Sequence, residues 1–535
     1  MDAVGHFALT FGIISGMEKA ATDIYTFDEL REKGFTYVDK TGLILPLVDN
    51  SIGSQFFIAR PRRFGKSLLV STLHALFAGR RELFKGLAIE PKWDWSKSWP
   101  VLHLDMGSCQ SGTVEGVRGK IRDCLVSESE RLGVALREDG DVAGLFRFLI
   151  QDLAAQSPDG QMVLLVDEYD KPLLGHLSKP DVTQFRDQLK EFYSVIKTLE
   201  GKQRFTFLTG VSKFSKVSIF SDLNNLKDRT MTPGEATLLG YTHDELKKYF
   251  PETLAKIGRA NGTDAEGAFR KVIEWYDGYK FHPAAEKVVN PVSFGCCAEN
   301  GEFNNYWSKT AMTTFLTDAL KEHPLDFSTL DVDERDLEAY EPSNPRIVTL
   351  LYQTGYLTTK GFRQMGVVRS YDLCFPNLEV ENSFLTSLAP IYAGLDPSQS
   401  SNFQRAAIRA LLSGDVDGFV KALRSFFANI PYDLTDRQNE QMWQTIVYVV
   451  LRSIGVNVSA EVKTNEGRID MTCETPGGIF LIEFKLDQSA DEALAQIERN
   501  NYAEKYDFAG KRVFKVGVSF SSEKRTIVDV KTANA

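Results

Sequence analysis

Short apolar strands alternate with helical segments over roughly the first 240 residues of the chain. Four segments have the length and composition of strands, at residues 56–59, 101–105, 161–167 and 204–210. Their apolar residues are nearly continuous, which is typical of strands that are covered on both faces. Helical segments separate these strands. The pattern therefore predicts an α/β domain with a parallel sheet between layers of helices.

The pattern changes in the middle of the chain. Thr242 is followed by acidic residues in the first turn of an expected helix, which makes it a favourable N-terminal cap. Residues 350–357 predict a helix that ends at Gly355 and passes into a strand, as in a small winged-helix unit. Residues 382–430 have a helical pattern without a further signal. This part is therefore expected to be mainly helical.

Aromatic residues are concentrated in three short segments of the middle part, at 275–281, 289–294 and 305–307. Lys280 and Lys309 lie among them, and an aromatic surface with interleaved cations can stack on nucleic-acid bases. The alternative is a packed joint between a core domain and a helical lid. The packed joint is the favoured interpretation, because clustered aromatic residues more often serve packing than base stacking.

The pattern near the C-terminal end predicts a second, smaller α/β unit. Residues 468–473 and 479–485 have the composition of two strands, and the turn at 475–478 joins them as an antiparallel hairpin. An amphipathic helix is expected before the hairpin and another after it, beginning at Ala490. Residues 513–520 predict a further strand.

Length, charge and cysteine content limit the functional classes. A chain of 535 residues has room for several domains, and it contains no apolar run long enough to cross a membrane. The six cysteines are scattered without a CxxC pair, so neither a zinc ribbon nor a disulfide framework is expected and a reducing cytoplasm fits best. The net charge of −10 means that contact with nucleic acid would need a local basic patch.

Part of a phosphate-binding motif follows the first predicted strand. Gly65, Lys66 and Ser67 stand at a junction from strand to helix. At such a junction the backbone N–H groups and the helix N-terminus hold phosphates. The lysine reaches the β- and γ-phosphate oxygens, and the serine hydroxyl meets Mg²⁺. These three residues predict a nucleotide site that would take ATP with magnesium.

The same loop departs from the motif at its first glycine, where Arg60 stands. The motif alone therefore leaves two interpretations equally open, a nucleotide site and a basic loop that turns a corner. Arg62 and Arg63 are further candidates for contact with the phosphates. No arginine finger can be assigned, because Arg62, Arg63 and Arg229 are equivalent candidates and each can equally be a surface charge.

Acidic residues end the third predicted strand and strengthen the nucleotide interpretation. Asp167 would hold magnesium, and Glu168 would orient the water that attacks the γ-phosphate. The alternative is a strand whose end is solvated by acids, which a lone match would favour. Thr209, at the end of the next strand, is a candidate polar sensor of the γ-phosphate or a turn residue before Gly210.

Three segments together resemble the bacterial AAA-ATPase-like family. They are residues 60–67, residues 166–170 and residues 210–226, and parts of the aromatic segments resemble later blocks of the same family. In that family the first glycine of the phosphate-binding loop is normally replaced, so Arg60 does not count against membership. The resemblance implies a P-loop ATPase core with a helical lid, and it leaves open how tightly ATP is held and whether it is hydrolysed.

Carboxylates on the predicted C-terminal hairpin indicate a second site. Strand alternation places Glu483 and Lys485 on one face and Phe484 on the other, and the hairpin brings Asp470 beside them. Asp470, Glu483 and the Phe484 carbonyl would bind Mg²⁺, with Mn²⁺ as an alternative ion, and Lys485 would help activate the water that attacks a phosphodiester. An edge hairpin with one charged face is the alternative.

Residues on the two flanking helices support the functional interpretation. Glu440 would complete the metal site from the helix before the hairpin, and Gln496 and Tyr502 are available near the site. This order of elements resembles the PD-(D/E)XK nuclease superfamily, and more closely the branch that is fused behind AAA-ATPase-like domains. The residues that match are Glu440, Asp470, Glu483, Lys485 and Gln496.

The predicted organisation is α/β and multidomain. An N-terminal extension (1–20) precedes an AAA-like P-loop ATPase core (21–240), a helical lid with a winged-helix-like region (241–360), a helical connector (361–431) and a restriction-endonuclease-like α/β domain (432–535). The expected function is ATP binding, with hydrolysis, coupled to Mg²⁺-dependent cleavage of DNA in defence against foreign DNA or in repair. DNA and a further copy of the chain are the expected partners, and a membrane is not.

Two other functional classes remain open from the sequence. The first is a nucleotide-controlled oligomeric switch that carries a dormant nuclease. The second is a non-catalytic nucleic-acid-binding module with a decayed phosphate loop. The acidic pair at 167–168 and the Glu-x-Lys pair at 483–485 argue against the second class, whereas Arg60 keeps it open.

Overall fold

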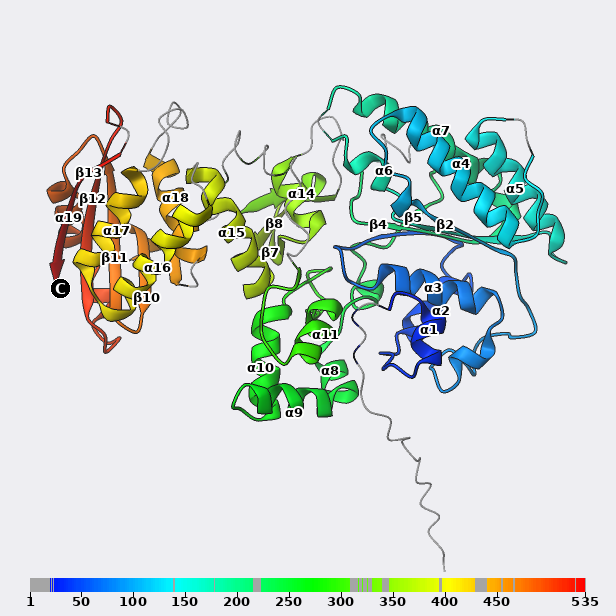
Figure 1. Cartoon of the computed structure of the whole chain (residues 1–535), viewed down its shortest axis with the longest axis horizontal. Coiled ribbons are helices and arrows are strands. Elements are labelled where there is room, and N and C mark those ends of the chain that lie inside the picture. The colour runs from blue at the N-terminus through cyan, green and yellow to red at the C-terminus, as the bar shows by residue number, and fades with distance from the viewer. Residues whose placement is uncertain are drawn as a thin grey trace, which may run out of the picture.

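The computed structural model describes most of the chain and is elongated, with an N-terminal α/β unit at one end and a C-terminal unit at the other (Figure 1). Helical segments and a small sheet lie between these units. The described residues are 24–137, 140–177, 179–214, 223–307, 330–338, 346–393, 397–428, 440–453, 456–464, 467–524 and 526–534, with the single residues 20, 22, 316, 320 and 325. The predicted extension at 1–20 and residues 215–222 of the AAA-like motif lie almost wholly outside them.

The N-terminal sheet is parallel, as the continuous apolar runs predicted. Its strands are β1 (Gln55–Ala59), β2 (Val101–Asp105), β3 (Met162–Asp167), β4 (Gln203–Gly210) and the short β5 (Lys227–Asp228). Their order is β2-β3-β4-β1-β5, so β4 separates β1 from β3. The four predicted strands are all present, and β5 is an addition.

Helices cover both faces of this sheet (Figure 1). One layer contains α1 (Phe27–Glu32), α2 (Thr41–Val48) and α3 (Lys66–Phe77), and the other contains α4 (Val114–Arg131), α5 (Val142–Gln156), α6 (Lys171–Leu174) and α7 (Val182–Thr198). Successive residues of β1 face opposite layers, since Phe56 and Ile58 join one buried cluster and Phe57 joins the other. Burial on both sides explains why the strand carries no polar alternation.

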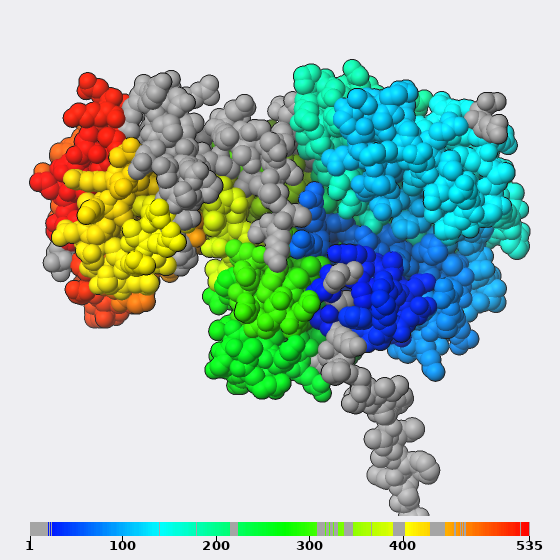
Figure 2. Space-filling view, in the orientation of Figure 1, coloured from blue at the N-terminus to red at the C-terminus, as the bar shows by residue number. Residues whose placement is uncertain are grey.

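The middle part begins with a helical group. Its helices are α8 (His243–Tyr249), α9 (Pro251–Ala260), α10 (Ala265–Tyr276) and α11 (Pro291–Asn300). Thr242 caps α8 as predicted, in a reciprocal capping box with Glu245. Lys40 also contacts Glu245 at 2.5 Å, and the green surface of this group adjoins the dark blue surface of the N-terminal helices (Figure 2).

The aromatic segments of the middle part form a packed joint. Tyr276, Tyr279, Phe281, Tyr306 and Trp307 are all buried. Buried rings are not available to stack on bases, so the favoured interpretation holds for these residues, while Lys309 lies outside the described part of the chain.

A small antiparallel sheet follows, in the order β6-β8-β7. Its elements are β6 (Asp331–Asp333), α13 (Glu334–Glu338), α14 (Ile347–Thr354), β7 (Thr358–Met365) and β8 (Val368–Cys374). Gly355 ends α14 in the left-handed region, with φ of 90°, as the sequence predicted. The winged-helix description of this unit stays a prediction.

The helices α15 (Leu378–Ala393), α16 (Pro397–Ser413), α17 (Val416–Ala428) and α18 (Glu440–Ser453) lead into the C-terminal sheet. That sheet is mixed and has the order β13-β12-β11-β10-β9. Its strands are β9 (Asn457–Lys463), β10 (Arg468–Thr475), β11 (Gly478–Leu486), β12 (Val513–Ser521) and β13 (Thr526–Asn534), with α19 (Ala490–Arg499) between β11 and β12. The predicted hairpin is β10–β11, whereas β11 pairs with β12 in parallel.

No helix within the described segments has both the length and the apolar composition needed to span a bilayer.

Candidate functional site

The loop between β1 and α3 has the backbone geometry of a phosphate cradle. Gly65 is the N-cap of α3 and has φ of 86°, and no side chain caps the helix. Arg63 also has a positive φ, of 68°, which is unfavourable for a residue with a Cβ atom. The N–H groups at the start of α3 are therefore not used by a cap, and the helix dipole favours an anion there.

Lys66 is folded back onto its own loop. Its Nζ atom donates hydrogen bonds to the carbonyl oxygens of Arg60 and Pro61, both at 3.0 Å. The side chain is buried, and this burial lowers the pKa of Lys66, while the negative charges of Asp167, Asp170 and Glu168 act in the opposite direction. The ammonium group thus lies under the loop with three carboxylates close enough to affect its charge.

Ser67 and Asp167 come together from α3 and the end of β3. Asp167 is buried, which raises its pKa, and the nearby Ser67 hydroxyl and Lys66 ammonium lower it in part. Because β4 lies between β1 and β3, this meeting takes place across an intervening strand. The structure therefore brings Lys66, Ser67 and Asp167 into one group, as the two separate motifs suggested.

Glu168 stands beside this group in a constrained conformation. Its φ is 50°, and its amide donates a 2.8 Å hydrogen bond to Oδ1 of Asp167. Its Oε2 atom lies 3.4 Å from Nζ of Lys171, and a Cβ atom at Gly107 would lie 3.0 Å from it. The carboxylate thus faces the segment that follows β2, where Gly107 leaves room for it.

Arg60 turns away from the phosphate cradle. Its guanidinium donates to the carbonyl oxygens of Ala59, Thr230 and Glu235 at 2.7 to 3.0 Å and lies 4.1 Å from the ring centre of Phe281. Burial lowers the pKa of Arg60 to about 10. The arginine that replaces the expected glycine therefore ties β1 to the segment after β5, and only its backbone takes part in the loop.

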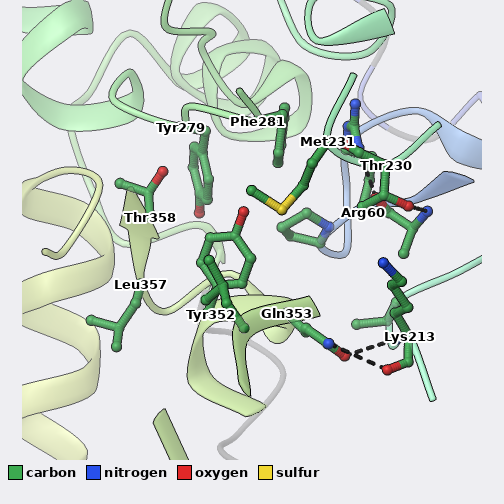
Figure 3. A pocket seen from close by; sticks show the side chains of 14 residues that line it. Arg60, Lys213, Thr230, Met231, Tyr279, Phe281, Tyr352, Gln353, Leu357 and Thr358 are labelled. Carbon is green, nitrogen blue, oxygen red and sulfur yellow. Dashed lines mark hydrogen bonds between the residues drawn. The ribbon is translucent and has the colours of Figure 1, made fainter. Parts of the chain in front are cut away.

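A mostly apolar hollow lies beside Arg60 (Figure 3). Tyr279, Phe281 and Tyr352 form aromatic walls, and the side chain of Gln353 hydrogen-bonds the backbone of Lys213. The hollow thus lies where β1, the end of β4 and α14 meet. A second hollow touches Gly65 and is lined by residues such as Tyr37, Leu68, Leu239 and Tyr241.

Arg62, Arg63 and Thr209 are placed differently from the central group. Arg63 donates a 2.6 Å hydrogen bond to the carbonyl oxygen of Tyr306, and Arg62 lies near enough to Tyr356 to affect its pKa. Thr209 donates to the Ile58 carbonyl at 2.7 Å, within the sheet. The Thr209 hydroxyl is thus engaged in β4–β1 packing, and the structure does not bring it into the loop group.

The C-terminal hairpin places the predicted residues of the second site side by side. The pairing of β10 and β11 sets Met471 opposite Ile482, and Asp470 and Glu483 are the neighbouring residues on the two strands. The Asp470 amide donates to Glu483 Oε2 at 3.4 Å, and the Phe484 amide donates to Asp470 Oδ2 at 2.9 Å. The two carboxylates thus share one end of the hairpin, although they are 13 residues apart in sequence.

Lys485 and Gln496 complete the described part of this cluster. Nζ of Lys485 lies 3.3 Å from Glu483 Oε1 and 3.1 Å from the Phe484 carbonyl oxygen. Gln496, on α19, donates to the same Glu483 oxygen. The Phe484 ring points to the core on the opposite face, as strand alternation predicted. Glu440 is the first residue of α18, and its side chain lies outside the described part.

Glu483 is the most perturbed carboxyl group of this cluster. Burial, helped by the charge of Asp470, raises its pKa to about 7, and Lys485 acts against the rise. Among the described residues no group of three or more His, Cys, Asp and Glu side chains is arranged to hold a metal ion. Asp470, Glu483 and the Phe484 carbonyl nevertheless form a set of hard oxygen donors of the type that Mg²⁺ and Mn²⁺ prefer.

Sequence reasoning gave Asp170 no role, and it named Tyr502 near the second site without its partner. Asp170 is buried and accepts hydrogen bonds from the Val211 and Ser212 amides, so it fixes the chain after β4 beside Lys66. The hydroxyl group of Tyr502 contacts both the carbonyl oxygen and the amide of Arg468, two residues before Asp470. Asp170 belongs to the acidic segment at 166–170, which the sequence already showed. No local sequence pattern indicated which residue Tyr502 would contact.

Comparison with known proteins agrees with this two-part arrangement. A family model described as "Predicted AAA-ATPase" matches residues 22–220, and a model described as "PD-(D/E)XK nuclease superfamily" matches residues 438–530. A relative from Azotobacter chroococcum mcd 1, described as "Uncharacterized protein in vnfD 5'region", is 35% identical over 523 residues, which cover 96% of this chain and 98% of the relative.

The fold and the two sites define a protein with an α/β NTPase-like unit and a mixed-sheet nuclease-type unit. The chain belongs to the predicted AAA-ATPase family, and it carries a C-terminal domain of the PD-(D/E)XK nuclease superfamily. Domains of these two kinds typically use a nucleotide and a divalent metal ion.

The raised pKa of Glu483 predicts pH-dependent metal binding. Its folded pKa of about 7 exceeds the ordinary value of 4.5, so the protonated form prevails below pH 7 and has fewer lone pairs for a cation. Affinity for Mn²⁺, measured by calorimetry, should rise by about tenfold per pH unit below pH 7 and level off above pH 8. Glu474→Gln, on the same hairpin, is the control, and a pH-independent affinity would contradict the assignment.

Proposed function

We propose that this protein is a Mg²⁺-dependent nuclease whose cleavage of DNA is controlled by the binding and hydrolysis of ATP. The observation that carries the proposal is the cluster of Asp470, Glu483, Lys485 and Gln496 on β10, β11 and α19. The cytoplasm is the proposed location, with defence against foreign DNA or DNA repair as the setting. The setting rests on the resemblance alone.

The chemistry of the C-terminal cluster fits phosphodiester hydrolysis. A bound Mg²⁺ ion would be held by Asp470, Glu483 and the Phe484 carbonyl and would supply Lewis-acid activation of the phosphate and of water. Lys485 would place a positive charge beside the attacked phosphate. Gln496 holds the carboxylate of Glu483 in its orientation, so α19 fixes the site from outside the sheet.

The loop group fits nucleotide binding. Gly65 and the start of α3 would hold the phosphates, with Lys66, Ser67 and Asp167 directly beside them. The hollow that reaches Gly65 has apolar and aromatic walls that could contact a nucleotide base. Glu168 would orient the attacking water. Arg62 and Arg63 would add positive charge at the loop. Thr209 would serve as a sensor of the γ-phosphate only if its hydroxyl group gave up its hydrogen bond to the Ile58 carbonyl oxygen.

A second form of the proposal follows from the contacts of the loop with the middle part. Arg60, Pro61 and Arg63 all touch residues beyond position 228. Through these contacts the loop could act on the middle part in a nucleotide-controlled switch, for which we propose that oligomers of the chain form with ATP and that the nuclease is dormant without them. Sizing the protein with and without ATP distinguishes this form from a monomeric ATP-controlled nuclease.

Lys485→Ala should reduce cleavage of linear, circular and single-stranded DNA in Mg²⁺ or Mn²⁺ by about 100-fold or more, because one charged group at the reacting phosphate is lost. Lys511→Ala, which removes an exposed lysine of the same domain, is the control and should cut normally. Retained cleavage in Lys485→Ala with an intact fold would place the chemistry elsewhere.

Lys66→Ala should remove ATP binding, since truncating a buried charged partner costs about 2 to 5 kcal/mol of binding free energy. Calorimetric titration with ATP measures this loss directly. The exposed Lys85 offers a matched substitution, Lys85→Ala, for which wild-type affinity is expected. An unchanged affinity in Lys66→Ala would reject the loop as a nucleotide site.

Glu168→Gln should keep ATP affinity and reduce phosphate release by about 100-fold or more, because a group that orients the attacking water acts on turnover. Steady-state phosphate release and ATP titration of the same preparation separate these two effects. Glu200→Gln is the control. Normal turnover in Glu168→Gln would exclude it as the base.

A further inference from the structure

One peptide group lies between the phosphate loop and the helix that leads to the C-terminal domain. The carbonyl oxygen of Tyr306 accepts the 2.6 Å hydrogen bond from Arg63, and the amide of the following residue, Trp307, donates to Glu379 Oε1 at 2.7 Å. The Tyr306 amide donates to the same oxygen at 2.6 Å. Arg63 and Glu379 thus hold the two ends of the Tyr306–Trp307 peptide.

Glu379 is held by this arrangement in the protein interior. Glu379 is 1% exposed and lies in the first turn of α15. Burial raises its pKa to about 7, whereas the Trp307 and Tyr306 amides and the charge of Arg63 act against the rise. A buried carboxyl group depends strongly on such donors, because an unsatisfied one is costly. Movement of the peptide would therefore act on α15.

The next residues of α15 connect to α18. Glu381 forms a salt bridge with Arg452, and Asn382 donates to the Ser453 carbonyl oxygen at 3.0 Å. Asn382 also accepts a 2.8 Å hydrogen bond from Asn305, which neighbours the peptide group. The helix α18 packs against β9, β10 and β11, and the last two carry Asp470 and Glu483. Hydrogen bonds therefore join the loop to the end of α18, and the packing of α18 joins it to the nuclease-type sheet.

We propose that Glu379 is a positioning residue that transmits the state of the nucleotide site to the C-terminal domain. A bound phosphate competes for the Arg63 guanidinium, which prefers a phosphate to a neutral carbonyl. When Arg63 leaves, the peptide loses a polarising donor, its N–H bond to Glu379 weakens, and the start of α15 shifts. Glu381 and Asn382 carry the shift to Arg452 and Ser453 of α18. This inference rests on the proposed function, and it adds the route of control.

Amide hydrogen exchange of the full chain, with and without ATP, tests the route independently of cleavage. In the wild type, ATP should slow exchange at the phosphate loop and change it by about fivefold or more in both α15 and α18. In the double variant Glu381→Ala/Asn382→Ala, which removes both polar links between α15 and the end of α18, the change should remain in the first turn of α15 and disappear from α18. In Glu379→Ala it should disappear from both helices while the loop stays protected. Thr386→Ala, on an exposed position of α15, should behave as wild type.

The two variants are expected to lose the ATP-induced change in hydrogen exchange at different helices. This difference is diagnostic, because a residue with a merely structural role would not abolish the change in α18 while leaving it in α15. The double variant Glu381→Ala/Asn382→Ala removes two partly buried side chains and keeps the test valid if Glu379→Ala fails to fold. A change in α18 that persists in the double variant, or a wild type in which ATP affects only the loop, overturns the route. The predicted exchange pattern without any DNA cleavage would reject the nuclease and leave the route in place.

Discussion

The parallel order of the N-terminal sheet is the constraint on which the nucleotide-type site depends. Parallel strands end at the same edge, so the residues after β1, β3 and β4 must meet there. Placing β4 between β1 and β3 sets the spacing between Lys66 and the Asp167–Glu168 pair. Asp170 then fixes the end of β4 through two backbone amides. The order of the strands therefore determines which residues meet at this site more than any single loop does.

Several charges in the interior of the described part of this protein are satisfied by the backbone. Lys66 and Arg60 donate to main-chain carbonyl oxygens, and Glu379 accepts from main-chain amides. Such partners are fixed in space by the fold, unlike flexible surface side chains, so each buried charge locks the position of a particular chain segment. The buried charges therefore mark positions where different parts of this chain contact one another.

Much of the fold and part of both sites could be predicted from the sequence, because those features are local. Continuous apolar runs gave the strands, and strand alternation placed Glu483 and Lys485 on one face with Phe484 opposite. The orientation of Arg60 could not be predicted, since its partners Thr230 and Glu235 lie about 170 residues away. The engagement of Thr209 with Ile58 depends on which strands are neighbours, and Glu379 has no local signal at all. The roles of the site residues remain predictions.

The position of β11 in the C-terminal sheet has a consequence for synthesis of the protein. This strand carries Glu483 and Lys485 and has β10 on one side and β12, in parallel, on the other. A parallel neighbour cannot be supplied by a hairpin, so β11 stays half-paired until residues 513–521 have left the ribosome. By then the N-terminal α/β unit and the middle part have already been made. A growing chain would therefore complete its N-terminal α/β unit before the sheet that carries Glu483 and Lys485.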